Sequence, residues 1–401
     1  MKVIVCQHGA RRRYAVPRIL ETAGMLAALY TDSCEHSLLG RMAKAMGPLA
    51  KGTLKRLANR RIAGIPQNKI FSTDRPFWLS MLDRTIIQNA ESRRYRKHCL
   101  HLSNAMMKWY KDVPKSIIYN MYCENLTFVA HAYSRGYPVV IDVYQNPSHH
   151  HILASEYKTI LPDYDYEAAC SDFKEAWFCD VAKHCSILLC PSEWVANAVR
   201  GLCPEHAHKI RMCPYGASID YGGRVNKPIK GRILWAGVEW VRKGLHYLAA
   251  AADELKPKYP ELDFRVAGVT DPEVMQMPMF KNINFLGKLD KARMQEEFLS
   301  VDMFVFPTLS EGMAGVVVEA LVAGCPVITT KAAGVDAIED GISGMLIKPS
   351  AVEVRVAIEQ VYLDRELRDN LSEESLKLRS LFTVETRANR LIAIIRELTK
   401  E

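Results

Sequence analysis

The chain has 401 residues and a formal net charge of +8, and 49% of its residues are hydrophobic. This length suits two domains, and the composition excludes a disordered or fibrous protein. No apolar run approaches the roughly 20 residues that span a bilayer, and Met1 leads directly into an apolar strand without the longer core of a signal peptide. We therefore expect a cytoplasmic protein whose eleven cysteines are reduced thiols.

The positive charge lies in the first half of the chain. Residues 1–215 hold 29 Lys and Arg against 18 Asp and Glu, a net of +11, while residues 216–401 hold 24 against 27, a net of −3. A basic first half indicates an anionic partner, such as a lipid surface, a lipid-linked phosphate or a nucleic acid. Nucleic acid is the weakest of these, because the basic residues lack interleaved stacking aromatics and no reader motif is present. We expect no nucleic-acid partner.

Three consecutive arginines follow the predicted first strand. Arg11, Arg12 and Arg13 begin a predicted helix that continues to about Leu29. Cations at a helix N-terminus oppose the helix macrodipole, at a cost of about 0.3–1 kcal/mol each. This unfavourable placement indicates that an anion binds there. Alternatively, Pro17 marks the true start of the helix, and the arginines lie in a solvated loop.

A basic stretch without acidic residues follows. Residues 36–73 contain eight Lys and Arg but no Asp or Glu, and Leu54, Leu57 and Ala58 recur at helical spacing. This pattern is typical of a basic amphipathic helix on an anionic membrane. It is equally typical of a helix that packs its apolar side onto its own domain. A second basic run, residues 93–98, is typical of a solvated helix face.

Short apolar runs predict strands that alternate with helices. In chain order the predicted strands cover residues 2–7, 116–119, 138–144, 186–190, 232–236, 263–268, 283–289, 302–307 and 326–330. This alternation is typical of α/β domains with parallel sheets. Residues 145–151 are expected to form a polar loop at the carboxyl edge of the first sheet. Their consecutive histidines do not converge on one metal as an i, i+4 pair would, so we predict no metal site.

The second half contains a lysine at the start of a helix. Residues 237–244 join a predicted strand to a helix predicted over residues 245–255, and they place Lys243 beside Gly244. The lysine adds its charge to the positive end of the helix dipole, which suits a diphosphate. The glycine and Lys-Ser/Thr spacing of a Walker loop is absent.

A second loop, residues 310–315, precedes a helix predicted over residues 316–323. Gly312 and Gly315 remove side chains where a ligand touches backbone, and the helix N-terminus suits phosphate. Glu319 lies within this otherwise apolar helix. A buried carboxylate needs a partner, and sugar hydroxyls are suitable donors; alternatively, Glu319 is exposed or salt-bridged within the protein.

Glu311 and Glu319 resemble the Glu-x7-Glu signature of the family 4 retaining glycosyltransferases, which have the GT-B fold. Further matching segments follow one another in the chain: residues 214–220, 237–244, 285–287, 321–327, Gly334 and 340–344. The resemblance covers residues 190–350 well and the first half in outline. It implies an α/β protein with two Rossmann-like domains, whose parallel sheets face each other across a cleft, and a C-terminal helix that crosses back to the first domain.

The resemblance also implies a division of labour between the domains. Residues 1–219, joined by the helix at residues 383–401, form the acceptor-side domain. Residues 220–382 form the domain that binds the nucleotide-sugar donor. Because the first loop of the family usually contains Gly-Gly, Gly9 marks the equivalent loop here. The candidate residues on this acceptor or phosphate side are Gly9, Arg11, Arg12 and Arg13.

For the donor, the resemblance implies that Glu311 binds hydroxyls of the sugar and Glu319 accepts from the ribose hydroxyls. Lys243 holds the diphosphate, and Arg242 supplies the charge that the family usually places at the position of Val238. The other expected donor-binding residues are Gly237, Lys288, Leu289, Gly312, Met313, Ala314 and Gly315. A histidine that contacts the transferred sugar in the family corresponds here to Tyr144 or His149.

The expected reaction transfers a sugar from a nucleoside-diphosphate sugar to a hydroxyl of a glycan or lipid-linked acceptor, with retention of configuration. The resemblance implies front-face attack, in which the leaving phosphate takes the acceptor's proton. We expect no cofactor besides the nucleotide-sugar co-substrate and no obligatory metal. Peripheral contact with the inner face of an anionic membrane is a further expectation. The alternatives are another GT-B enzyme, such as a nucleotide-sugar epimerase or a phosphorylase, and a non-catalytic nucleotide-sugar-binding or membrane-surface scaffold.

Overall fold

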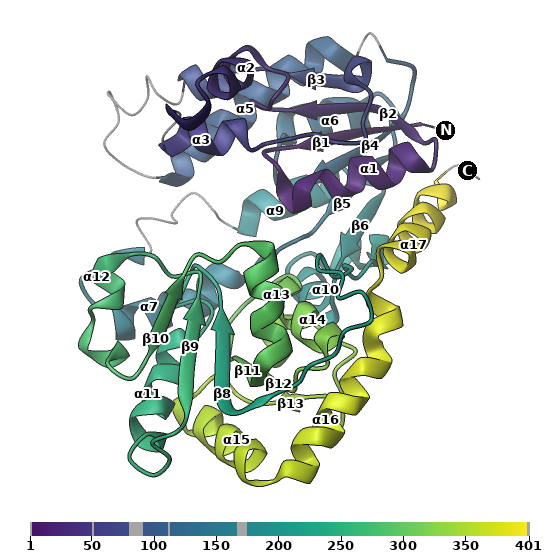
Figure 1. The fold of residues 1–401 in the computed structure, drawn as a ribbon. Helices are drawn as coiled ribbons and strands as arrows, with labels where there is room; N and C mark the ends of the chain where they lie inside the picture. The colour runs from purple at the N-terminus through teal and green to yellow at the C-terminus, as the bar shows by residue number, and fades with distance from the viewer. Residues whose placement is uncertain (1, 50–51, 80–90, 111–112, 167–174, 399–401) are drawn as a thin grey trace.

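The computed structural model describes residues 2–49, 52–79, 91–110, 113–166 and 175–398. Two parallel β-sheets form the centres of two α/β units, drawn one above the other in Figure 1. The strand order is β3-β2-β1-β4-β5-β6-β7 in the N-terminal sheet and β10-β9-β8-β11-β12-β13 in the C-terminal sheet. In both, the order reverses beside the first strand, as in doubly wound Rossmann-type domains. The predicted α/β class with two Rossmann-like units is confirmed.

The strands of the N-terminal sheet are β1 (Val3–Gln7), β2 (Leu26–Thr31), β3 (Ile70–Ser72), β4 (Ile117–Met121), β5 (Val139–Asp142), β6 (Ile187–Cys190) and β7 (Ile210–Met212). Those of the C-terminal sheet are β8 (Ile229–Ala236), β9 (Asp263–Ala267), β10 (Asn284–Gly287), β11 (Val301–Phe306), β12 (Val327–Thr329) and β13 (Met345–Leu346). The chain thus passes from one sheet to the other over residues 213–228.

The helices around the N-terminal sheet are α1 (Ala15–Thr22), α2 (Leu38–Ala45), α3 (Gly52–Ala58), α5 (Glu91–Trp109), α6 (Leu126–Ser134), α7 (His149–Ile160), α9 (Glu175–Lys183) and α10 (Glu193–Leu202). Those that follow are α11 (Leu245–Leu255), α12 (Pro272–Met275), α13 (Lys291–Ser300), α14 (Gly315–Ala323), α15 (Ala351–Leu363), α16 (Arg365–Lys377) and α17 (Val384–Glu397).

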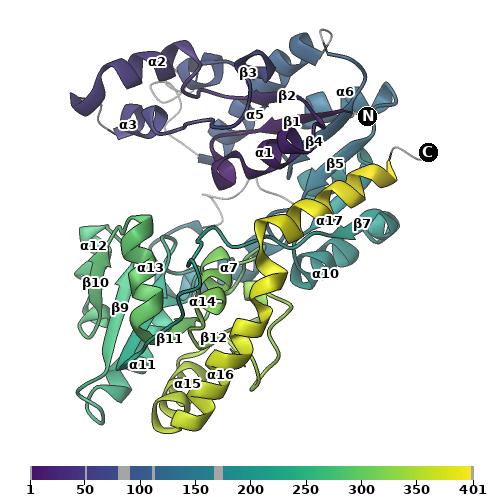
Figure 2. The same cartoon turned by 45° about the vertical axis from the view of Figure 1, so that its right-hand side comes forward.

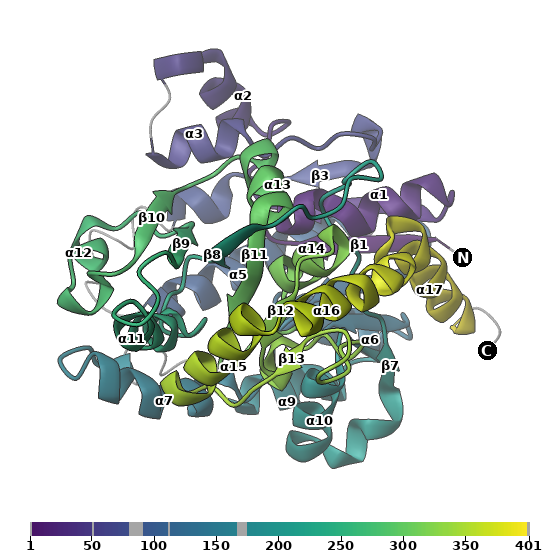
Figure 3. The same cartoon turned by 60° about the horizontal axis from the view of Figure 1, so that its bottom comes forward.

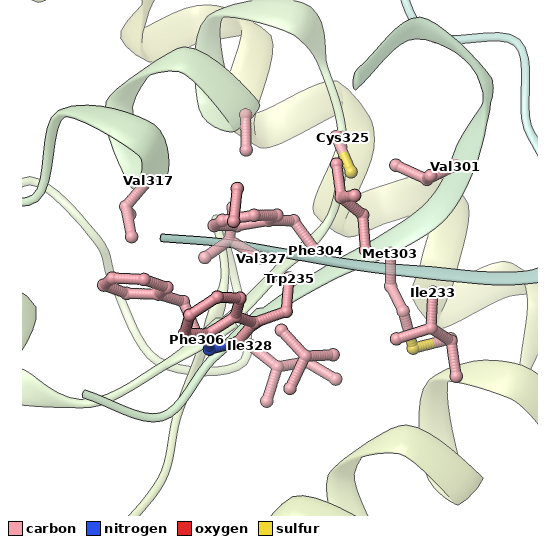
Figure 4. Packing of buried hydrophobic residues seen from close by; sticks show 14 of the residues in the cluster. Ile233, Trp235, Val301, Met303, Phe304, Phe306, Val317, Cys325, Val327 and Ile328 are labelled. Atoms are coloured by element: carbon pink, nitrogen blue, oxygen red, sulfur yellow. The ribbon is translucent and has the colours of Figure 1, made fainter. Parts of the chain in front are cut away.

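The core of the C-terminal unit explains why its strands are so apolar. All six residues of β11 are buried, because helices cover both faces of the sheet. Figure 4 shows Trp235, Phe304 and Phe306 packed together, and the ring centroids of Trp235 and Phe306 lie 6.2 Å apart. This rigid layer holds the loops after β8 and β11 at the carboxyl edge of the sheet.

The last helix returns to the N-terminal unit, as predicted. Figures 2 and 3 show α15, α16 and α17 following one another along the molecule, with α17 reaching the N-terminal strands. Leu391, Ile394 and Ile395 of α17 belong to the same buried cluster as Val3 and Val5 of β1. This apolar contact joins the two ends of the chain in one core.

The first helix is shorter than predicted. It begins at Ala15 instead of Arg11, because Arg12 and Arg13 have left-handed backbone angles. It ends at Thr22 instead of near Leu29, and Leu26 begins the buried strand β2. Gly24 has a φ of +65°, a left-handed conformation that ends helices. The apolar run after Gly24 fits a buried helix or a buried strand equally well by pattern, and its pairing with β1 makes it a strand.

The histidines after β5 also differ from the prediction. His149, expected in a polar loop, is the first residue of α7 and is buried. Although α7 precedes the C-terminal sheet by many residues, it packs against that unit. Leu153 shares a buried cluster with Leu309, and the side chains of Glu156 and His246 meet at 2.7 Å. The two units are therefore held together at α7 as well as at α17.

Candidate active site

The loops after β8 and β11 meet at one carboxylate. The Nζ of Lys243 lies 2.6 Å from the Oε1 of Glu311, and a guanidinium nitrogen of Arg242 lies 2.8 Å from the same oxygen. Arg242 also donates to the carbonyl of Ser310 at 2.7 Å. Burial opposes the charge of Arg242, but Glu311 more than compensates and raises its pKa above the usual value. Two predicted cations and the predicted glutamate thus form one ion-pair cluster.

Two glycines permit this close arrangement. Gly244 has a φ of +70°, and a Cβ added there would lie 2.1 Å from the carbonyl oxygen of Pro307. A Cβ at Gly312 would lie 1.9 Å from the carbonyl oxygen of Tyr144, which belongs to the other unit. Gly312 is therefore the point where the β11 loop and the N-terminal unit touch. Any larger side chain would force the two units apart.

The glutamate in the helix, Glu319, is half-buried on α14. Its carboxylate accepts a hydrogen bond from the hydroxyl of Ser218, in the segment between the sheets. Burial raises the pKa of Glu319, while the Ser218 bond and the charge of Lys291 act in the opposite direction. The carboxylate thus has a neutral hydroxyl partner, which is the kind of partner that a ribose would also provide.

The residues predicted to bind the sugar donor at the start of α14 have only part of their backbone N–H groups available for hydrogen bonding. The N–H of Ala314 donates to the carbonyl of Ala333 at 2.8 Å, so in this structure it is engaged within the protein. The Sδ of Met313 accepts from the N–H of Tyr215 at 3.0 Å. Gly315 is the exposed first residue of α14, and its N–H has no hydrogen-bond partner among the described residues.

The remaining predicted donor residues lie at neighbouring strand ends. Gly237 directly follows β8 and lies against the side chain of Lys243. A Cβ added at Gly237 would lie 2.4 Å from the Cδ of Lys243. Lys288 and Leu289 follow β10, with Lys288 exposed and Leu289 half-buried. The carboxyl ends of β8, β10 and β11 therefore bring these residues to the same edge of the sheet.

Across from this edge, the N-terminal unit contributes a buried acid that sequence reasoning missed. Glu124, 1% exposed, accepts from two nitrogens of Arg11 at 3.0 and 3.2 Å. Its Oε1 also accepts from the hydroxyls of Tyr95 at 2.6 Å and Tyr144 at 3.2 Å. The only available signal was a single acid five residues after a predicted strand, and nothing in the sequence joins it to Arg11, Tyr95 and Tyr144.

The two candidates for contact with the transferred sugar are placed differently. Tyr144 lines the cleft between the units, and the guanidinium carbon of Arg11 lies 4.0 Å from its ring centre. Burial and the charge of Glu124 raise the pKa of Tyr144, so its hydroxyl stays protonated. His149 lies outside that lining. Burial and His150 lower the pKa of His149 to about 3, and its Nδ1 lies 3.0 Å from the carbonyl oxygen of Asn146.

The cleft itself has a volume of about 240 Å³. The C-terminal unit contributes three lining residues, which are Glu311, Gly312 and Met313. The N-terminal unit and α17 contribute the others, which are Gln7, Arg11, Arg12, Val16, Met121, Asp142, Tyr144, Tyr215 and Arg387. Of the predicted arginines, Arg11 and Arg12 face it. Arg13 is exposed, and Gly9 donates its N–H to Asp32 at 2.8 Å. Asp142 accepts from the hydroxyls of Tyr119 and Tyr215 at 2.6 and 2.8 Å.

The sequence of the C-terminal unit also matches a known protein family. Residues 230–364 match the family model Glycosyl transferases group 1. The match to the group 1 glycosyltransferases covers β8 to α15, and so includes Lys243, Glu311 and Glu319. It does not extend to the N-terminal unit.

Two curated relatives align with part of this chain. Sulfoquinovosyl transferase SQD2 of Arabidopsis thaliana is 31% identical over 152 residues, which cover 36% of this chain and 29% of that protein. The D-inositol 3-phosphate glycosyltransferase of Corynebacterium urealyticum is 26% identical over 175 residues, which cover 39% of this chain and 40% of that protein. The chain thus aligns with less than half the length of either relative.

Solved structures match the whole fold. Anabaena HepE, in complex with UDP and glucose, superposes with a TM-score of 0.65 at 16% identity, covering 99% of this chain and 100% of HepE. WaaG, a glycosyltransferase involved in lipopolysaccharide biosynthesis, superposes with a TM-score of 0.64 at 15% identity, covering 98% of this chain and 99% of WaaG. The fold is therefore GT-B, as the sequence resemblance implied.

Proposed function

We propose that this protein transfers a sugar, with retention of configuration, from a nucleoside-diphosphate sugar to a hydroxyl of a glycan or lipid-linked acceptor. The observation that carries the proposal is the meeting of Lys243 and Arg242 with Glu311 at the edge of the C-terminal sheet, where Glu311 lines the cleft. Two cations beside a glycine loop and a helix N-terminus suit a diphosphate. The UDP and glucose bound by HepE, the group 1 family match and the Glu-x7-Glu spacing support the same function.

The chemistry follows from the charges. As the bond between the sugar and the diphosphate breaks, negative charge grows on the leaving phosphate, and Lys243 and Arg242 stabilise it. Glu311, released from these cations, accepts from hydroxyls of the donor sugar. The acceptor oxygen attacks from the same face, and its proton passes to the leaving phosphate. No protein nucleophile and no obligatory metal take part in this proposal.

Nucleotide binding is the first test. A thermal-shift panel of UDP, GDP and ADP is applied to the wild type and to Glu319→Ala, with Glu373→Ala, an exposed glutamate on α16, as the matched control. We expect one nucleotide to stabilise the wild type and the control, and Glu319→Ala to respond less because the ribose loses an acceptor. The absence of any nucleotide response would favour the scaffold alternative. Product analysis with the selected sugar nucleotide then separates transfer from epimerisation.

An exposed apolar surface in the basic stretch of the N-terminal unit supports a membrane-bound acceptor. In α2 and α3 the apolar side chains of Leu39, Ala43 and Leu57 pack together, so the prediction of packing within the domain holds for them. Four large apolar side chains nevertheless stay exposed in the same basic stretch: Leu38, Met42, Met46 and Leu49, with exposed fractions of 63%, 54%, 41% and 76%. We propose that this basic, apolar face rests on an anionic bilayer at the inner side of the membrane.

No helix among the described residues is long and apolar enough to cross a bilayer. Co-sedimentation at low salt with vesicles of phosphatidylglycerol or phosphatidylcholine tests surface binding. We expect binding to the anionic vesicles only, weakened in Met42→Gln and unchanged in Val352→Gln, which alters an exposed residue of α15. Equal sedimentation with both lipids would contradict the proposal.

A further inference from the structure

Two arginines in the cleft have no acidic partner. Arg387, on the first turns of α17, is 7% exposed, and its side chain makes no hydrogen bond or ion pair with the described residues. Arg12 keeps an exposed surface in the cleft and likewise has no ion pair within the described part of the chain. Both lie on the ring of Tyr215. The guanidinium carbon of Arg12 is 3.2 Å from the ring centre, and that of Arg387 is 4.7 Å from it.

Such a pair is costly unless something compensates it. Buried charges in proteins are normally paired, and two like charges on one ring repel each other. Burial lowers the pKa of Arg12, and the charge of Arg387 lowers it further, while Tyr215 and Asp142 act in the opposite direction. Arg387 is buried and Arg12 is exposed toward the cleft, and both present positive charge that no ion pair with the described residues satisfies.

The other charges that line the cleft are already engaged. Arg11 is bound to Glu124, and Glu311 is bound to Lys243 and Arg242. Asp142 accepts hydrogen bonds from two tyrosine hydroxyls, one of them that of Tyr215. Outside the two ion-pair groups, the lining therefore holds two cations, Arg12 and Arg387, against one carboxylate, Asp142.

The backbone fixes the position of Arg12. Arg12, Arg13 and Tyr14 have φ values of 46°, 51° and 58°, a left-handed turn that residues with a Cβ seldom adopt. Tyr14, at the end of this turn, is fully buried in the core that α17 shares with β1. The turn thus directs Arg12 toward the cleft while its neighbour anchors it, and α17 brings Arg387 to the same ring.

We propose that Arg12 and Arg387 bind an anionic group, phosphate or carboxylate, carried by the acceptor. This inference rests on the proposed function, because it places the anion beside Glu311 and Gly312, where the transferred sugar would lie. The donor's diphosphate has its own cations, Lys243 and Arg242, on the other side of the cleft. Two guanidinium groups on the opposite wall are suited to a second anion, since their planar forks match its oxygens.

Phosphate binding to the nucleotide-loaded protein tests this site. The full chain is first saturated with the nucleoside diphosphate selected by the thermal-shift panel, which occupies the donor side. Inorganic phosphate is then titrated by calorimetry into the wild type, Arg12→Gln, Arg387→Gln and Arg387→Lys. Arg390→Gln is the matched control, because Arg390 is an exposed arginine on the same helix. Circular dichroism confirms that each variant is folded.

We expect each glutamine variant to weaken phosphate binding roughly tenfold or more, the loss typical of a charge-assisted hydrogen bond. Arg387→Lys should bind with intermediate affinity, and Arg390→Gln should bind like the wild type. Unchanged phosphate affinity in Arg12→Gln and Arg387→Gln would overturn the site.

A nucleotide titration shows whether the two arginines bind an anionic group of the acceptor or the diphosphate of the donor. We expect the affinity for the nucleoside diphosphate to stay within about twofold of the wild type in Arg387→Gln, since the acceptor site is separate. If this affinity falls as much as the phosphate affinity, the arginines serve the donor's diphosphate and the acceptor assignment is wrong. If no nucleotide binds the wild type at all, the proposed function fails instead, and the phosphate titration without nucleotide still decides whether the two arginines form an anion site.

Discussion

The two walls of the cleft are built in different ways. On the C-terminal wall, the functional groups come from two short loops, and Lys243 and Glu311 each lie within a few residues of a helix start. On the N-terminal wall, Glu124 gathers Arg11, Tyr95 and Tyr144 from three distant parts of the chain. A wall made of short loops depends on residues close together in the sequence, whereas a wall made of long-range contacts depends on the fold of its whole unit. The family match, confined to residues 230–364, agrees with this division.

The largest effect is expected on the C-terminal wall. In Lys243→Ala the proposed diphosphate site loses one of its two cations, so kcat should fall by about 10²–10³, as when an oxyanion-stabilising donor is removed. Steady-state kinetics with the selected donor measures this. Lys348→Ala, which removes an exposed lysine after β13, serves as a comparison for a general loss of charge. A wild-type rate in Lys243→Ala would show that this wall does not hold the diphosphate.

A smaller effect, on stability, is expected on the N-terminal wall. Glu124→Gln replaces a buried carboxylate that accepts from Arg11, Tyr95 and Tyr144 by a neutral amide. The free energy of unfolding should fall by about 1.5–3 kcal/mol, the typical worth of hydrogen bonds to a charged group. Urea denaturation measures the change, and Glu373→Gln on α16 is the control. An unchanged midpoint would mean that this wall does not depend on the buried charge.

The smallest effect concerns pH and the histidine beside the N-terminal wall. His149 has a pKa of about 3 in the folded protein, below its value of about 6.5 in the unfolded chain, so the fold favours the neutral ring. As pH falls from 6.5 to 5, the unfolded chain gains a proton that the folded chain does not, and this residue should remove about 1.5 kcal/mol of stability.

Chemical denaturation of the wild type and His149→Gln at pH 8, 6.5 and 5 measures this difference. The variant should lose less stability on acidification than the wild type does. Parallel losses in the two proteins would indicate that His149 is not kept neutral by burial. His151→Gln is the matched control, because His151 is exposed on the same helix.

Much of the C-terminal unit could be predicted from its residues. The helices after the two loops were expected over residues 245–255 and 316–323, and they are Leu245–Leu255 and Gly315–Ala323. Gly244 directly precedes the first of these helices, and Gly324 directly follows the second. Glycines, helical periodicity and apolar strands can all be recognised within a short stretch of sequence. The first helix was predicted too long because its end at Gly24 is followed by an apolar run whose state depends on pairing with β1.

The sequence by itself determined the fold class, the strand-loop-helix units and the residues of the donor loops, because these depend on neighbours within about one turn or one strand. Only the tertiary structure decided that Glu124 joins Arg11, Tyr95 and Tyr144, and that Arg12 and Arg387 share the ring of Tyr215. Those contacts join residues that lie 20 or more positions apart, and Arg12 and Arg387 come from opposite ends of the chain. They exist because the sheet order and the return of α17 bring distant segments together, and no local pattern encodes that meeting.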